Sequence, residues 1–258
     1  MSERPTSPPP EVPFRPHPIA WTPEKIGRLW DYYASTPAYD AHYFSRHSGG
    51  SILDFVRRHV SLAGRHVLDF GCGPGFMLER ILEEGITASG LEFSKHSAEA
   101  ARRLLQRFSN FRGVTIAERL PSQLPDASFD AVLCIEVLEH LFPEQAAPTL
   151  AEARRLLAPG GLIVATTPNE ELLASETLQC PDCGCEFHRW QHLRQVDAES
   201  MTRLMRDAGF TPIVCQPTRF GPRRRRRLSR RLKDYLRRLT GSDRSEPTPH
   251  LIFIGRRD

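Results

Sequence analysis

The amino-acid sequence predicts an α/β protein built on a doubly wound parallel sheet. From His66 onward, short apolar strands alternate with amphipathic helices, which is the pattern of a parallel sheet covered by helices on both faces. A turn containing Gly71, Gly73 and Gly75 follows the first of these strands. With 258 residues and 40% hydrophobic content, the chain is long enough to form one large domain.

Two segments precede the predicted sheet. Residues 1–20 contain seven prolines and few apolar side chains, so we expect a disordered, proline-rich tail. Residues 21–61 should form a helical cap. Its first helix begins at Thr22-Pro23, an N-cap followed by a proline at the first helical position. Its second helix is expected over about 51–59, after a break at Gly49-Gly50.

The main domain is predicted to span residues 62–258. Its strands are expected at about 65–70, 86–92, 113–118, 129–135, 162–166, 211–216 and 251–254. Helices are expected over about 74–84 and 94–108, from Pro148 to the Pro159-Gly160 turn, and from Asp197 to Gly209. Each helix lies between two strands, so the segments can wind a parallel sheet in both directions.

The glycine-rich turn is the first candidate binding site. Glycine lacks a Cβ atom, so backbone N–H groups in this turn can come close to a ligand. A dinucleotide-binding turn has the spacing G-x-G-x-x-G, whereas here Asp69 precedes G-x-G-x-G. A carboxylate at this point would repel a pyrophosphate but attract a cationic ammonium or sulfonium. Asp69 therefore disfavours a nicotinamide cofactor, although a glycine-rich turn of another α/β protein stays an alternative.

Residues 67–76 resemble motif I of the class I S-adenosylmethionine (SAM) methyltransferases, and further similarity covers roughly residues 50–215. The resemblance implies a Rossmann-like sheet of seven strands, with the last strand inserted antiparallel between its neighbours. Glu92 ends the second strand and should accept both ribose hydroxyls of SAM, while Glu118 should border the adenine. The cofactor-binding residues expected with them are Asp69, Gly71, Cys72, Gly73, Gly75, Phe93 and Ile135.

A second motif, Glu136-Val-Leu-Glu139-His140, follows the fourth predicted strand. In a helical turn, its two carboxylates and one imidazole would share one face, where the carboxylates repel each other unless a cation joins them. The motif resembles the E-x-x-E-H element of ubiquinone-pathway and small-RNA O-methyltransferases. That resemblance implies a Mg²⁺ or Mn²⁺ site completed by His192, with Glu139 and His140 as catalytic residues. The alternative is a metal-free face in which His140 is a general base.

An insertion at residues 178–193 contains a C-P-x-C-G segment typical of zinc knuckles. The two thiolates of such a segment bind one metal ion across a tight turn. We assign Cys180, Cys183, Cys185 and His188 to a structural zinc. A redox-active thiol pair and unligated thiols are the alternatives.

A basic segment at residues 219–240 carries ten arginines and one lysine against one aspartate. An apolar stripe of Leu228, Leu232, Tyr235, Leu236 and Leu239 predicts an amphipathic helix. Such a helix suits an anionic membrane surface or RNA, although docking of the stripe on the domain explains it equally well.

The resemblance implies a SAM-dependent methyltransferase that transfers to the oxygen of a hydroxylated small molecule or a lipid-linked acceptor. The alternative is a non-catalytic SAM-binding adaptor that engages a membrane or nucleic acid through the basic helix. Neither an apolar run of 18 residues nor a signal peptide is present, so we expect a cytoplasmic protein, peripheral to the membrane if the basic helix binds lipid. The sequence leaves the acceptor and the oligomeric state open.

Overall fold

The computed structural model describes residues 14–222 and 248–258. Within them, the main sheet comprises β2 (His66–Phe70), β3 (Thr87–Glu92), β4 (Phe111–Ile116), β5 (Phe129–Ile135), β6 (Leu157–Pro168), β9 (Phe210–Thr218) and β10 (His250–Arg257). Its seven strands have the order β4-β3-β2-β5-β6-β10-β9. Only β10 runs antiparallel to its neighbours in the described sheet, as predicted.

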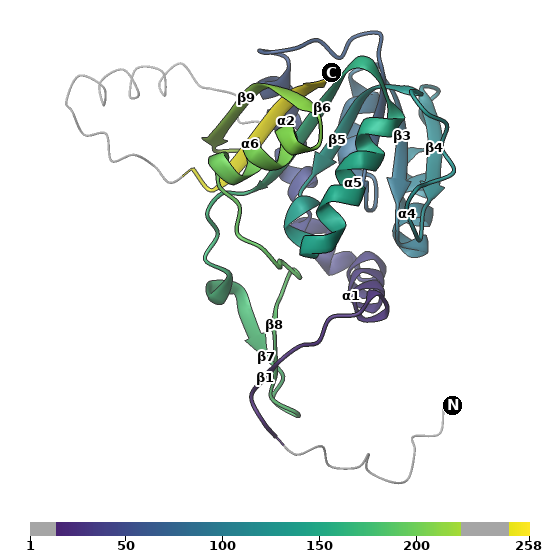
Figure 1. The fold of residues 1–258 in the computed structure, drawn as a ribbon. Coiled ribbons are helices and arrows are strands. Elements are labelled where there is room, and N and C mark those ends of the chain that lie inside the picture. The colour runs from purple at the N-terminus through teal and green to yellow at the C-terminus, as the bar shows by residue number, and fades with distance from the viewer. Residues whose placement is uncertain (1–13, 223–247) are drawn as a thin grey trace, which may run out of the picture.

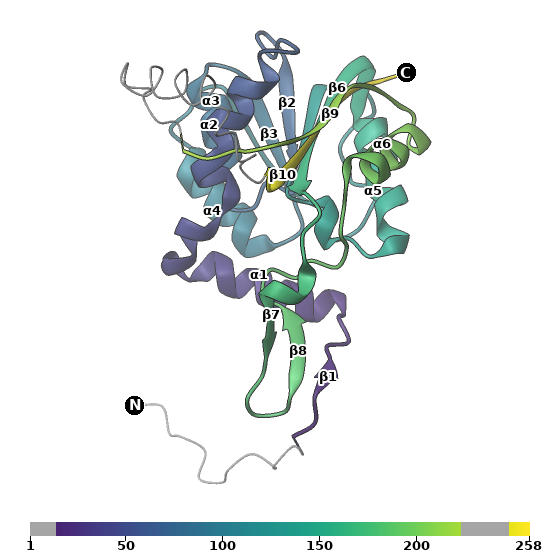
Figure 2. The ribbon, with the colours of Figure 1, turned by 90° about the vertical axis from the view of Figure 1, so that its left-hand side faces the viewer.

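Helices cover both faces of this sheet. The helices are α1 (Pro23–Ser35), α2 (Phe44–Val56), α3 (Phe76–Glu83), α4 (Lys95–Leu105), α5 (Pro143–Leu156) and α6 (Ala198–Asp207). Figure 2 shows α2, α3 and α4 on one face of the sheet and α5 and α6 on the other. Successive strand residues such as Val67 and Leu68 enter the two different cores on these faces, and both are fully buried. The predicted fold class is therefore confirmed.

The second cap helix differs from the prediction. Helix α2 begins at Phe44, and Gly49 and Gly50 lie inside it instead of breaking the chain before it. A Cβ atom on Gly49 would lie 3.1 Å from Arg80 Cγ and 3.3 Å from Met77 Sδ of α3. Glycine at this position therefore permits close packing of α2 on α3, a tertiary role that local sequence rules do not indicate.

Helix α5 also begins earlier than predicted. It starts at Pro143 and contains Pro148, which we expected to open the helix. A proline inside a helix removes one backbone hydrogen bond. Pro148 lies little more than one turn after the first residue, so the lost hydrogen bond is near the start of the helix. Arg155, in the last turn of α5, helps to hold the segment between β4 and β5.

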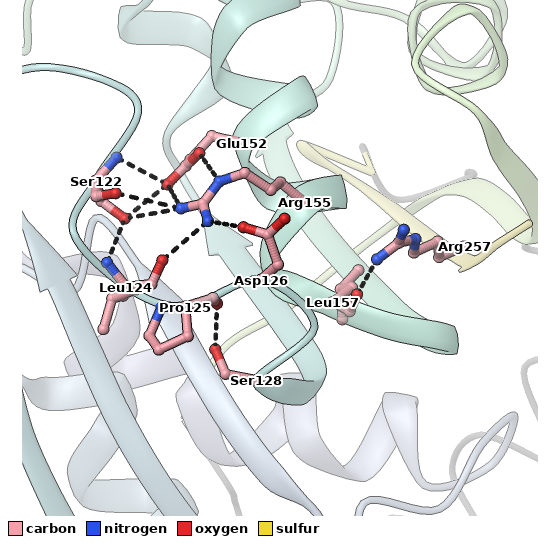
Figure 3. Close-up of polar contacts among 9 residues, drawn as sticks. All are labelled: Ser122, Leu124, Pro125, Asp126, Ser128, Glu152, Arg155, Leu157 and Arg257. Carbon is pink, nitrogen blue, oxygen red and sulfur yellow. Dashed lines mark hydrogen bonds and ion pairs between the residues drawn. The ribbon is translucent and has the colours of Figure 1, made fainter.

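The segment between β4 and β5 borders the candidate site and is held in place by a network of polar contacts (Figure 3). Arg155 donates from Nη2 to Glu152 Oε1 (2.7 Å) and from Nη1 to the carbonyl of Leu124 (2.9 Å). Ser122 donates to the same Glu152 carboxylate through its N–H (2.9 Å) and its hydroxyl (2.6 Å). Burial alone would raise the pKa of Glu152, but the contacts with Arg155 and Ser122 lower it.

A small second sheet projects from the domain beyond α1 (Figures 1 and 2). It contains β1 (His17–Pro18), β8 (Cys185–His188) and β7 (Thr177–Gln179), in the order β1-β8-β7. Residues 15–19, predicted as part of a disordered tail, instead form backbone hydrogen bonds with residues 183–186 of the inserted segment. Residues 1–13 of that tail lie outside the described residues, as do positions 223–240 of the predicted basic helix.

Three short 3-10 turns complete the described chain: η1 (Pro37–His42), η2 (Leu138–His140) and η3 (Leu173–Glu176). In the described ranges, every helix is too short or too polar to cross a membrane.

Candidate active site

The glycine-rich turn lies at the carboxyl end of β2, between β2 and α3. Gly71, Gly73 and Gly75 have positive φ angles of 78°, 51° and 91°, a conformation that favours glycine. A Cβ atom on Gly71 would lie 2.9 Å from Val137 Cγ2, and one on Gly75 would lie 3.0 Å from Ala101 Cβ of α4. The turn thus needs glycine for its backbone and for its packing.

Glu92 lies beside this turn, as predicted. Its Oε2 accepts a hydrogen bond from the N–H of Gly73 (2.7 Å), and its Oε1 accepts one from the N–H of Ser94 (2.8 Å). These bonds orient the carboxylate along the wall of a cavity of about 710 Å³. A carboxylate oriented in this way can accept hydrogen bonds from ribose hydroxyls.

Asp69 has a different position from the one we predicted. Its side chain is 2% exposed, lies behind the glycine turn, and does not line the cavity. Its Oδ2 has no hydrogen-bond partner among the described residues. Burial, followed by the charge of Glu92, raises the pKa of Asp69 to about 8. Asp69 therefore has no direct access to a ligand in this cavity.

Most of the other predicted cofactor residues line the cavity: Gly71, Cys72, Gly73, Phe93, Glu118 and Ile135. Gly75 instead faces α4 behind the wall, as its contacts with Ala101 and Leu105 show. Glu118 is exposed and forms an ion pair with Lys95 (2.7 Å) at the mouth of the cavity. The turn, the end of β3 and the end of β5 therefore converge on one space.

Two of the predicted metal-binding residues, His140 after β5 and His192 after β8, line the same cavity, and the buried Glu139 lies beside them. Glu139, His140 and His192 each offer one ligand atom, and these atoms lie within 4.8 Å of one another. Glu139 is 1% exposed, and neither of its carboxylate oxygens has a hydrogen-bond partner in the described part of the chain. Burial, followed by the charge of Glu136, raises the pKa of Glu139 well above its ordinary value. A divalent cation would relieve this arrangement.

Both histidines present one ring nitrogen to this group. His192 Nδ1 lies 2.5 Å from Glu171 Oε2, and a nitrogen facing a carboxylate carries a proton. His140 Nδ1 lies 3.4 Å from the carbonyl of Gln191 and donates to it in the same way. The unprotonated Nε2 of each ring is then the nitrogen that can bind a metal. Burial, followed by His192, lowers the pKa of His140 to about 3, so its ring is neutral at physiological pH.

Glu136 is not part of this compact group. The turn η2 begins at Leu138 instead of at the strand end, and Glu136 has a φ of 53°. Its Oε1 accepts a hydrogen bond from the Thr166 hydroxyl of β6 (2.8 Å). The spacing i, i+3, i+4 requires one continuous helical turn, which the chain does not form here. Glu136 still lines the cavity beside His140.

An aromatic wall lies next to His140. Trp30 of α1 contacts the His140 ring edge to face at 5.0 Å between centroids, and Tyr33 contacts Trp190 at 5.5 Å. Gln191 joins these parts, because its amide donates to the carbonyl of His140 (2.9 Å) and accepts from Trp30 Nε1 (3.2 Å). Sequence reasoning missed this wall, since aromatic residues at helical spacing, such as Trp30 and Tyr33 of α1, are more often ordinary core.

Glu171 and His188 form a second group with His192, again within 4.8 Å. Burial alone would raise the pKa of Glu171, but its contacts with His188 and His192 lower it to about 2. His188 Nδ1 accepts from the backbone N–H groups of Trp190 (3.3 Å) and His192 (3.2 Å), so its Nε2 carries the proton. Its Nε2 has no hydrogen-bond partner among the described residues and faces Glu171 Oε1 at 3.6 Å, so His188 belongs to this group and not to the cysteines of the insertion. The signal for Glu171 was its position just after β6, at the carboxyl end of a parallel strand.

Comparison with known proteins identifies relatives of this chain. Residues 41–216 match the model of a family described as a methyltransferase domain. A ubiquinone biosynthesis O-methyltransferase of Chromobacterium violaceum is 38% identical over 128 residues, which are 47% of this chain and 52% of that protein. The corresponding protein of Alkalilimnicola ehrlichii is 36% identical over 181 residues, 62% of this chain and 71% of that protein. The chain spans about half the length of several of these curated relatives.

Solved structures show the same fold at lower identity. A chain of the complex between the Haloferax volcanii Trm112 methyltransferase activator and its methyltransferase has a TM-score of 0.62 at 19% identity, covering 88% of this chain and 96% of that chain. The Burkholderia thailandensis 1,6-didemethyltoxoflavin-N1-methyltransferase, solved with bound S-adenosylhomocysteine, has a TM-score of 0.58 at 18% identity, covering 95% and 94%. These likenesses confirm the class I methyltransferase fold.

Proposed function

Because the chain belongs to the methyltransferase domain family, we propose that it transfers the methyl group of SAM to the oxygen of a hydroxylated acceptor. One observation carries this proposal. The glycine turn and Glu92 line the same cavity as His140 and His192, so a candidate cofactor site and candidate metal ligands share one space. Relatives named as ubiquinone biosynthesis O-methyltransferases support transfer to oxygen.

The residues of this chain fit a divalent cation. Glu139 supplies two buried carboxylate oxygens that have no hydrogen-bond partner among the described residues, and His140 and His192 supply the ring nitrogens opposite the Nδ1 atoms that face Gln191 and Glu171. The carboxylate suits Mg²⁺ or Mn²⁺ and the imidazoles suit transition-metal ions, so Mn²⁺ fits this set of ligands better than Mg²⁺. A bound cation would lower the pKa of the acceptor hydroxyl and orient it. The alternative role of His140 as a general base is less well supported, because a group with a pKa of about 3 accepts protons poorly at neutral pH.

The protein's own contribution is to hold the two reactants in line. SAM already carries a reactive methyl group, so positioning accounts for most of the required rate enhancement. The glycine turn and Glu92 would hold the cofactor, and the wall of Trp30, Tyr33 and Trp190 would orient the acceptor and exclude water. An aromatic wall favours an acceptor with a flat or apolar portion next to its hydroxyl.

The test is methyl transfer from labelled SAM to extract components by the purified protein. We expect brief EDTA treatment to abolish transfer, and added Mg²⁺ or Mn²⁺ to restore it. Calorimetry should show that SAM still binds in EDTA, because the metal group lies on the acceptor side of the cavity. Full transfer in EDTA would indicate a metal-free methyltransferase, and a protein that does not bind SAM would refute the proposal.

A further inference from the structure

We propose that the tip of the β7–β8 hairpin is a structural zinc site, with Cys180, Cys183 and Cys185 as three ligands and His17 as the fourth. The proposal is independent of the methyl-transfer chemistry. In this site His17 replaces the predicted fourth ligand, His188. The Nδ1 of His188 accepts from two backbone N–H groups, and its Nε2 faces Glu171 (3.6 Å) in the interior of the protein. His188 also lies three residues along β8 from Cys185, about 10 Å in an extended strand.

The hairpin tip holds its three thiols on one short loop. Strands β7 and β8 are antiparallel, and the N–H of Cys180 donates to the carbonyl of Cys185 (2.8 Å). The N–H of Gly184 returns to the carbonyl of Cys180 (2.9 Å), which closes the turn.

His17 reaches this tip from the N-terminal segment. Strand β1 is parallel to β8, with His17 opposite Cys185. Side chains at opposite positions of neighbouring strands project from the same face of a sheet, so the imidazole and the thiol share one face. His17 Nδ1 lies 2.7 Å from the carbonyl of Arg15 and donates to it, which leaves Nε2 free to bind a metal.

The backbone of the tip is shaped to receive this segment. Arg15 donates its N–H to the carbonyl of Cys183 (3.1 Å), and His17 donates to that of Gly184 (3.1 Å). Gly184 has a φ of 80°, and a Cβ atom there would lie 2.4 Å from the carbonyl oxygen of Arg15. Gly184 therefore has two roles: its positive φ forms the turn, and its missing Cβ atom lets the N-terminal segment pack against the hairpin tip.

Three thiolates and one imidazole are an established tetrahedral zinc set. In the described ranges, the compact groups of metal-binding atoms lie at Glu139 and Glu171, so the ligands at the tip must still converge. His17 is exposed and the three cysteines are only partly buried, so rotation about their Cα–Cβ bonds can bring them together when metal binds. Zinc here would join two segments that lead to the cavity wall, β1 toward Trp30 and β8 toward Trp190.

The test is the metal content of the full chain in reducing buffer without chelators. We expect about one tightly held zinc per chain in the wild-type protein. Cys183→Ser should lose this zinc, and His17→Ala should bind it at least about tenfold more weakly in a chelator competition. His96→Ala and Cys215→Ser are matched controls, because they remove an exposed imidazole and a thiol from other parts of the fold. Both controls should retain zinc like the wild type.

Cobalt substitution separates this site from the Glu139 group. Thiolate-to-cobalt charge transfer requires sulfur ligands, so its absorption band reports the hairpin alone. X-ray absorption of the unmutated zinc protein should show three sulfur atoms and one nitrogen, which removes any dependence on how His17→Ala folds. A wild-type protein without zinc and without the cobalt band would overturn the site. Equal zinc affinity in His17→Ala, or a four-sulfur shell, would overturn the assignment of His17.

Discussion

Replacement of Glu139 by glutamine should uncouple metal binding from cofactor binding. Both Glu139 oxygens are buried and have no hydrogen-bond partner in the part of the chain that the structure describes, so a cation that binds there stabilises the folded chain over the unfolded one. At a metal concentration 100 times the dissociation constant, this stabilisation is about 2.7 kcal/mol. A chain of this length gains about 2–4 °C in Tm per kcal/mol, so the wild-type Tm should rise by about 5–11 °C.

The Glu139→Gln protein should show no such rise, because an amide keeps the shape of the side chain but cannot supply an anionic ligand. Thermal denaturation followed by circular dichroism, with a Mg²⁺ or Mn²⁺ titration, measures the shift. Calorimetry with SAM is the control, since Glu139 lies beneath the acceptor side of the cavity and the variant should bind SAM like the wild type. Turnover of an accepted substrate should fall strongly.

The shift should also depend on pH. Burial raises the pKa of Glu139, so a metal ion must displace a proton from it. The wild-type Tm rise at a given metal concentration should therefore be larger at pH 8 than at pH 6. An equal rise in wild type and Glu139→Gln, or an active Glu139→Gln enzyme, would refute the assignment of Glu139 as a metal ligand.

Three further perturbations test one proposed cofactor contact and the energetics of two buried carboxyl groups. Glu92→Ala should weaken SAM binding by about 1–3 kcal/mol in calorimetry, because it unpairs charge-assisted hydrogen bonds, and unchanged affinity would contradict the ribose role. The pKa of Asp69 is raised to about 8 in the folded protein, so between about pH 4 and 8 this carboxyl is protonated in the folded chain but ionised in the unfolded chain. The unfolding free energy should therefore fall as the pH rises through this range, by up to about 1.4 kcal/mol per pH unit. Denaturant titrations should show this contribution to the slope disappearing in Asp69→Asn. Arg155→Met leaves the buried Glu152 carboxylate with only its two hydrogen bonds from Ser122 and should lower the unfolding free energy by about 3 kcal/mol. Arg103→Met, in an exposed pair with Glu99, should lower it by under about 1 kcal/mol in the same titrations.

Much of the fold was predictable from local pattern. The fourth predicted strand, residues 129–135, matches β5 residue for residue. The predicted N-caps Thr22 and Asp197 both accept hydrogen bonds from their helices, at 3.3 Å and 2.7 Å. Strand periodicity and capping are properties of neighbouring residues, so a sequence reveals them directly. The errors at Gly49 and Pro148 arose because tertiary packing overrides the usual breaking effect of glycine and proline.

The sequence by itself determined the glycine turn, the acidic end of the second strand, and the association of Glu139 with His140. Each depends on residues close in sequence or on the geometry of a parallel sheet. Only the tertiary structure decided that Glu171 orients His192, that Thr166 donates a hydrogen bond to Glu136, and that His17 lies opposite Cys185. Those last three pairs are separated by 21, 30 and 168 residues along the chain, so no local periodicity relates them. The first two pairs meet because burial of two apolar cores brings the strand ends together, whereas His17 meets Cys185 through the pairing of β1 with β8 in the small sheet.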